Sequence, residues 1–227
     1  MVKMTTNWFR NNFRKITVAA ALMLAGGTGA VLAAAPAANA APVARAAPAA
    51  VHIDAELTAL WTKVLETPSP QNPFGTGGDP AACWVLPDGT LAPFGFVHPF
   101  AGTCTVKPGT KFLVVGSSVE CSTLPGDTPP EPPGTAEAVL RACAVSNDLS
   151  SAPVVTVDGS PVPVREVETS LMNITLPASN IFPPDPAGTT GQSVGHGWVA
   201  HVDPLTPGTH TFASPGLFST QIVVSGG

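Results

Sequence analysis

The stretch GQSVGHGWVAHVDPLTPGTHTF, which runs from Gly191 to Phe212, is the most informative part of the chain for its fold. Apolar and polar residues alternate through HGWVAHV, and this alternation is typical of a half-buried β-strand. A proline- and glycine-containing segment from Pro204 to Gly208 then separates it from a second extended run. We therefore predict a β-hairpin. Trp198, Ala200 and Val202 would share one face of its first strand, with Trp198 in the core.

The rest of the chain carries further strand signals. Asp88-Gly89 and Asp158-Gly159 each separate two extended runs, which is the strongest short-range hairpin signal. Pro108-Gly109 predicts a further hairpin between TCTV and KFLVV, and LFSTQIVVS is predicted as the last strand. Strands and helices do not alternate as a parallel sheet requires. These features predict a mainly β, disulfide-bonded fold, an antiparallel β-sandwich of the jelly-roll or immunoglobulin-like kind, with two short peripheral helices.

Two segments have helical periodicity. The first helix would begin with Asp54 as its N-cap and end before Pro68, and the second would begin with Thr135 as its cap. Apolar residues recur at helical spacing on one face of each. These residues are Leu57, Leu60, Trp61, Val64 and Leu65 in the first helix, and Val139, Leu140, Cys143 and Ala144 in the second.

The chain contains four cysteines and no C-x-x-C spacing, which argues against a zinc ribbon. An even number of cysteines in an exported chain indicates two disulfides. Three pairings are possible, and we predict the sequential one, Cys83–Cys104 and Cys121–Cys143, because it closes the shorter loops. The second bridge would tie the second helix to the end of the preceding strand.

The N-terminus has the features of a secretory signal peptide. A basic start without acidic residues leads into a long apolar run and then into Ala38-Asn39-Ala40, an A-x-A cleavage site. A retained membrane anchor is the alternative, but the glycines of the apolar run favour cleavage near Ala40. We predict a signal peptide over residues 1–40, a disordered Ala/Pro linker over 41–52 and a single β-rich domain over 53–227. The mature protein would be secreted.

Removal of the leader makes the chain more acidic. Residues 41–227 keep six Lys and Arg against all fifteen Asp and Glu, a net charge of −9. This charge argues against nucleic acid and anionic membrane surfaces as partners. No later segment is apolar for long enough to insert into a membrane.

A G-x-S-x-G match at Gly191 to Gly195 raises the possibility of a serine hydrolase. Its nucleophile elbow needs a strand before the serine and a helix after it. Here a loop precedes Ser193 and a strand follows. Asp203 and His210 complete a Ser…Asp…His order only within one predicted hairpin, so we predict no catalytic residues.

The histidines are a second candidate for chemistry. His196 and His201 are five residues apart and would face opposite sides of a regular strand. His201 and His210 would be neighbours across the hairpin, with Asp203 or Glu120 as a further ligand from elsewhere. Histidines with solvent or local partners are the default, so we predict no metal site and no other cofactor.

Carboxylates give weaker signals. Glu120 follows the apolar strand KFLVVGSSV, and its carboxyl is either exposed at a strand end or buried with a raised pKa. Glu166 and Glu168 are two residues apart, as expected for a solvated strand edge.

The C-terminal part resembles an uncharacterised family of exported bacterial and fungal proteins. SVGHGWVAHVDPLTPGTHTF is similar to that family's D-G-Y-W-V-x-L-x-P-L-x-P-G-x-H-T pattern, and VTVDGSPVP, ITLPASNIF, CTVKPGTKFLVV, VECSTL and LRACA resemble its other blocks. The resemblance covers roughly Ala81 to Phe212. It departs at His196, where the family has Asp, and at Trp198-Val199, where it has Tyr-Trp. The resemblance implies export and a β-rich domain, and it implies no activity.

We expect a secreted, non-catalytic extracellular domain that binds a cell-surface or environmental ligand, such as a glycan, through loops and exposed aromatic residues. One alternative is a hydrolase or metal-dependent enzyme that uses His201, His210 and a carboxylate such as Glu120. Another is a structural envelope protein that acts by self-assembly. The ligand and the oligomeric state are not specified by the sequence. The aromatic candidates are Phe74, Trp84, Phe94, Phe96, Phe100 and Trp198, and the candidate binding residues are Trp84, Glu120, Trp198, His201 and His210.

Overall fold

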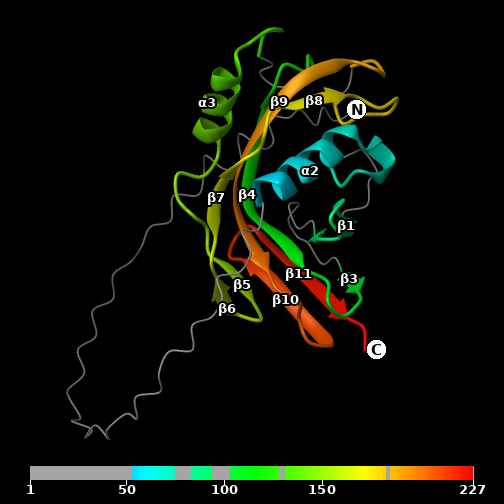
Figure 1. The fold of residues 1–227 in the computed structure, drawn as a ribbon, viewed down its shortest axis with the longest axis vertical. Helices are drawn as coiled ribbons and strands as arrows, with labels where there is room; N and C mark the ends of the chain where they lie inside the picture. The colour runs from blue at the N-terminus through cyan, green and yellow to red at the C-terminus, as the bar shows by residue number, and fades with distance from the viewer. Residues whose placement is uncertain (1–52, 75–82, 94–102, 128–130, 183–184, 227) are drawn as a thin grey trace, which may run out of the picture. The chain divides into compact units, whose positions relative to one another are not determined.

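A computed structural model describes residues 53–74, 83–93, 103–127, 131–182 and 185–226. The predicted signal peptide and linker, and the candidates Phe94, Phe96 and Phe100, lie outside these residues. The described part is mainly β, with two sheets and two α-helices (Figure 1). This confirms the predicted fold class.

The first sheet is built around two long antiparallel strands, β4 and β9. Their pairing runs from Phe112 opposite Val202 to Ser122 opposite Ser193. The strand order is β1-β2-β4-β9-β7, and β8 also pairs with β9. The strands are β1 (Cys83–Val85), β2 (Leu91–Pro93), β4 (Phe112–Ser122), β7 (Arg165–Glu168), β8 (Met172–Thr175) and β9 (Thr190–Val202).

The second sheet has the order β3-β11-β10-β5-β6. Its strands are β3 (Thr103–Val106), β5 (Val155–Val157), β6 (Ser160–Val162), β10 (Gly208–Ser214) and β11 (Phe218–Val224). Each sheet contains one parallel pair, β2 with β4 and β3 with β11. Both sheets are therefore mixed, where the sequence predicted purely antiparallel pairing.

The two sheets pack against each other through a shared apolar core, as expected of a sandwich. Phe112, Ala200 and Val202 from the first sheet are buried in one cluster with Phe212 and Ile222 from the second. The rings of Phe112 and Phe212 meet edge to face, with centroids 5.1 Å apart. This edge-to-face geometry is the favourable one for aromatic pairs.

The helices cover the first sheet from its two sides. Helix α2 (Ile53–Glu66) packs its Leu57, Leu60 and Val64 against Val199. Alternation along β9 turns Val199 toward α2 and Ala200 toward the second sheet. Helix α3 (Glu137–Asn147) lies on the opposite side of β4 and β9 from α2 (Figure 1). A 3₁₀-helix, Ser69–Gln71, follows α2.

The helix predictions hold except at the two N-termini, where neither Asp54 nor Thr135 is the cap. Helix α2 begins one residue before the predicted cap and ends before Pro68, with the predicted apolar stripe facing inward. Helix α3 begins at Glu137, so Thr135 as its cap is wrong: the Thr135 N–H donates to the Pro132 carbonyl in a preceding turn. Val139 is 48% exposed and does not belong to the buried face.

The turns decide which strands pair. Asp88-Gly89 and Asp158-Gly159 connect the predicted hairpins β1–β2 and β5–β6. The predicted hairpins at Pro108-Gly109 and Pro204 to Gly208 are wrong. In both cases the chain passes from one sheet to the other, between β3 and β4 and between β9 and β10.

Backbone geometry distinguishes the β5–β6 turn from the turn at Pro108-Gly109. A two-residue type I′ hairpin turn needs positive φ at both central residues, and Asp158 (51°) and Gly159 (79°) provide it. Proline holds φ near −65° and cannot take the first position. Pro108-Gly109 instead lies in a turn closed by the Thr110 N–H and the Lys107 carbonyl, with Gly109 at 86°.

Both predicted disulfides are present. Cys83 is bonded to Cys104, and this bridge connects β1 of the first sheet to β3 of the second. Cys121 is bonded to Cys143, which fixes α3 to the end of β4. This confirms the sequential pairing. The two bridges indicate an oxidising, extracellular environment.

Candidate functional site

The Ser…Asp…His arrangement suggested by the sequence does not assemble. Ser193 lies within β9, not at a turn between a strand and a helix, and its hydroxyl donates to Glu120 Oε2. His210 is on β10 of the second sheet, where its Nδ1 lies 2.7 Å from Asp158 Oδ2. Asp203 follows the end of β9. Ser193 and His210 therefore cannot act together as nucleophile and base.

His201 and His210 are not neighbours, because the predicted hairpin between them does not form. The Nε2 atom of His210 is 2.8 Å from the Thr206 carbonyl oxygen, so both ring nitrogens have local partners. The hydrogen bond with Asp158 raises the pKa of His210, and the Thr206 carbonyl adds to this effect. A site that combines His201 with His210 is therefore wrong.

His201 instead meets a buried carboxylate, Glu56 of α2. Its Nε2 lies 3.5 Å from Glu56 Oε1, which also accepts a 3.2 Å hydrogen bond from the Thr90 hydroxyl. Burial lowers the pKa of His201, and the positive charge of Lys111 lowers it further. Burial also raises the pKa of Glu56 to about 7, and the nearby Asp88 contributes to this rise. A carboxyl that is about half protonated at pH 7 thus joins α2 to the turn between β1 and β2.

Among the described side chains, Glu56 Oε2 is buried without a hydrogen-bond partner. No group of three His, Cys, Asp or Glu side chains in this part of the chain is arranged to hold a metal ion. The contacts of Glu56 with Thr90 and His201 therefore fit a pH-dependent packing interaction better than a metal site.

His196 and Asp148 form a buried polar pair, which sequence reasoning missed. Its Nδ1 lies 2.8 Å from Asp148 Oδ2 and its Nε2 lies 3.1 Å from Glu166 Oε1. The side chains of His196 and Asp148 are 2% and 0% exposed. The Ser117 hydroxyl donates to Asp148 and not to the imidazole. Since Glu166 already occupies Nε2, the cluster cannot activate Ser117 as a nucleophile.

The contacts of His196 instead tie the secondary structure elements together. They connect β9 to Asp148 at the end of α3 and to Glu166 of β7. The predicted opposite orientation of His196 and His201 is confirmed, since His196 faces Asp148 while His201 faces Glu56 of α2. The neighbouring Glu168 is part of the predicted solvated edge and pairs with Arg141.

Glu120 is half-buried within β4, which is closer to the buried interpretation than to an exposed strand end. Burial and, to a smaller extent, the negative charge of Asp127 together raise its pKa to about 8. The hydrogen bond from Ser193 acts in the opposite direction. The Glu120 carboxyl packs beside β9, where it accepts from Ser193. It does not pair with His201, which lies next to Glu56.

The aromatic side chains in the described residues do not form an exposed binding platform. Trp84 is 8% exposed, and Phe74 packs against the core next to α2. Trp198 is half-buried, and its indole N–H donates to the Leu149 carbonyl at 2.9 Å. These three residues therefore give no support to an exposed aromatic platform, and Phe94, Phe96 and Phe100 lie outside the described residues.

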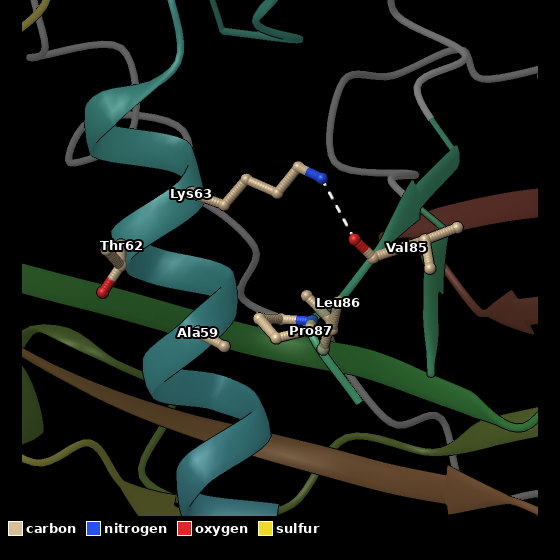
Figure 2. Close-up of a pocket in the computed structure, with 6 residues that line it drawn as sticks. All are labelled: Ala59, Thr62, Lys63, Val85, Leu86 and Pro87. Carbon is tan, nitrogen blue, oxygen red and sulfur yellow. Dashed lines mark hydrogen bonds between the residues drawn. The ribbon is translucent and has the colours of Figure 1, made fainter. Parts of the chain in front are cut away.

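The described residues form an open groove between α2 and β1. It has a volume of about 380 Å³ and a mostly apolar lining. Lys63 reaches across it from α2, and its Nζ donates to the Val85 carbonyl at 3.0 Å (Figure 2). The lining residues are Ala59, Thr62, Lys63, Val85, Leu86 and Pro87.

Comparisons of the chain with protein-family models, with curated proteins and with solved structures find no match. Within the described ranges, none of the helices is long and apolar enough to cross a membrane. The functional argument therefore depends on the geometry of this chain alone.

Proposed function

We propose that the protein is a secreted, disulfide-bonded domain that binds an extracellular ligand without chemical conversion, and that the ligand occupies the groove between α2 and β1. The leader-like N-terminus supports export, with cleavage near Ala40. The two disulfides agree with this compartment.

The groove itself carries the proposal. Ligand sites are typically concave and mostly apolar, with a few polar groups that fix orientation. The α2–β1 groove has this character, with apolar contributions from Ala59, Leu86 and Pro87 and one cation from Lys63. The groups best suited to chemistry elsewhere, His196, His210 and Ser193, are each engaged by a local partner.

A thermal-shift screen of the secreted protein against soluble polysaccharides and peptides tests this proposal. A ligand at a hundred times its dissociation constant stabilises the folded state by about 2.7 kcal/mol. The Ala59→Phe variant places a ring in the groove, since Ala59 projects into it in Figure 2. Ala138→Phe, on the exposed face of α3, is the matched control.

We expect the ligand-induced shift to disappear in Ala59→Phe and to persist in Ala138→Phe. A shift that survives Ala59→Phe would place the site elsewhere. Chemical turnover of the stabilising compound would show that the protein is an enzyme.

A further inference from the structure

The backbone of β1 is arranged for the addition of a strand. β1 lies at the end of the first sheet and pairs with β2. The Leu86 N–H donates to the Thr90 carbonyl at 2.8 Å, which makes these two residues a hydrogen-bonded pair. Bonded and non-bonded pairs alternate in antiparallel ladders, so Val85 and Leu91 form a non-bonded pair. The N–H and C=O of Val85 therefore point away from β2.

A lysine side chain occupies this outer edge. The outward carbonyl of Val85 accepts its hydrogen bond from Lys63 Nζ across the groove (Figure 2). The N–H of an added strand would take the same position. The Lys63 ammonium also lies 5.5 Å from the centre of the Trp84 ring. The flexible Lys63 side chain thus donates to the Val85 carbonyl, and the backbone N–H of a ligand can donate to it instead.

We propose that the groove receives an extended peptide that adds to the edge of β1 and presents an acidic side chain to Lys63. This inference rests on the proposed function and names the ligand of the same groove. The peptide N–H replaces Lys63 at the Val85 carbonyl, and its own carbonyl accepts from the Val85 N–H. Main-chain pairing of this kind provides affinity, and alternate side chains provide specificity.

The charge of Lys63 and the apolar lining of the groove determine which peptide sequence is preferred. The ammonium of Lys63 is released from Val85 on binding and pairs with a ligand carboxylate, which favours Asp or Glu at one position. Side chains on the same side of the added strand contact Ala59, Leu86 and Pro87 and are therefore apolar.

Selection from a phage-displayed library of random octapeptides tests the inference. The targets are the wild-type secreted protein, Lys63→Met and Lys107→Met. Methionine keeps the apolar stem of lysine, and Lys107 lies on an exposed turn after β3 and does not line the groove. We expect Asp or Glu to be enriched at one position on the wild type and on Lys107→Met, and this preference to be lost on Lys63→Met.

The enriched peptide then distinguishes backbone pairing from other modes. Replacement of its acidic residue by the matching amide should weaken binding to the wild type about tenfold and leave binding to Lys63→Met nearly unchanged. N-methylation of the amide that faces β1 should abolish binding to both proteins, because it removes the strand-pairing N–H.

Several results would overturn the inference. These are a library without acidic enrichment, an enrichment unaffected by Lys63→Met, and full binding of the N-methylated peptide. Concentration-dependent dimers that block peptide binding would assign the edge of β1 to a second copy of the chain. A polysaccharide that stabilises the wild type but not Ala59→Phe would refute the peptide ligand. It would still support the groove as the binding site.

Discussion

Glu56 shows how a single residue can escape sequence-based prediction. It lies on the apolar face of α2, between Ile53 and Leu60, and is only 8% exposed. Its contacts are with Thr90 and His201, which are distant in the chain. Periodicity identifies the buried face of the helix, but it cannot identify partners that meet only in the folded protein. His196 and Asp148 escaped prediction for the same reason.

Glu56 should make the protein less stable as the pH rises. Its carboxyl titrates near 4.5 in the unfolded chain and near 7 in the folded protein. The folded state therefore holds this proton more tightly, and the unfolding free energy falls as the pH rises from about 4.5 to about 7. At about 1.4 kcal/mol per pKa unit, this contribution is at most about 3.5 kcal/mol.

The Glu56→Gln variant tests this linkage. We expect it to lose less stability than the wild type between pH 5 and pH 8, by roughly 2–3 kcal/mol. Urea unfolding at the two pH values measures the difference. The lowered pKa of His201 has the opposite effect: it makes the folded state less stable as the pH falls below 6.5. Because Glu56→Gln retains His201, this effect is present in both proteins.

Asp54→Asn, on an exposed position of the same helix, is the control for charge and should keep the wild-type pH dependence. An identical pH dependence in Glu56→Gln and the wild type would show that Glu56 does not carry the effect.

At the scale of elements, the identity of the turn residues determines which strands pair. The Asp-Gly turns form the hairpins β1–β2 and β5–β6 as predicted, with positive φ at Gly89 in the first and at both Asp158 and Gly159 in the second. The segments with Pro-Gly were predicted to do the same and instead carry the chain between the sheets. The individual strands were predictable from alternation, but their partners were not: Gly89 and Gly109 both have positive φ, yet only Gly89 lies in a hairpin.

The disulfide between β4 and α3 should be a major stabilising element. Cys121 and Cys143 are separated by 22 residues, and closing a loop of this size stabilises the folded state by about 3 kcal/mol in the chain-entropy account. We expect the Cys121→Ser/Cys143→Ser double variant to lose this amount in urea unfolding. Equal stability of the double variant and the wild type would show that packing alone holds α3 on the sheet.

At the scale of the whole molecule, the first sheet separates two environments. One side, under α2, contains Glu56, His201 and the groove, and the other contains the His196 cluster and the second sheet. Composition and periodicity predicted the mainly β class, the disulfides and α2. They could not predict the groove, because it arises where Lys63 of α2 meets Val85 across the tertiary structure.

The central claim is that a ligand occupies the groove and pairs with β1. Amide hydrogen exchange of the secreted protein, with and without the selected peptide, tests it most directly. The account predicts that the peptide slows exchange at the Val85 amide and along α2 near Lys63, and leaves β10 and β11 unchanged. Exchange at Val85 that is unaffected by a bound peptide, or protection confined to the second sheet, would contradict it.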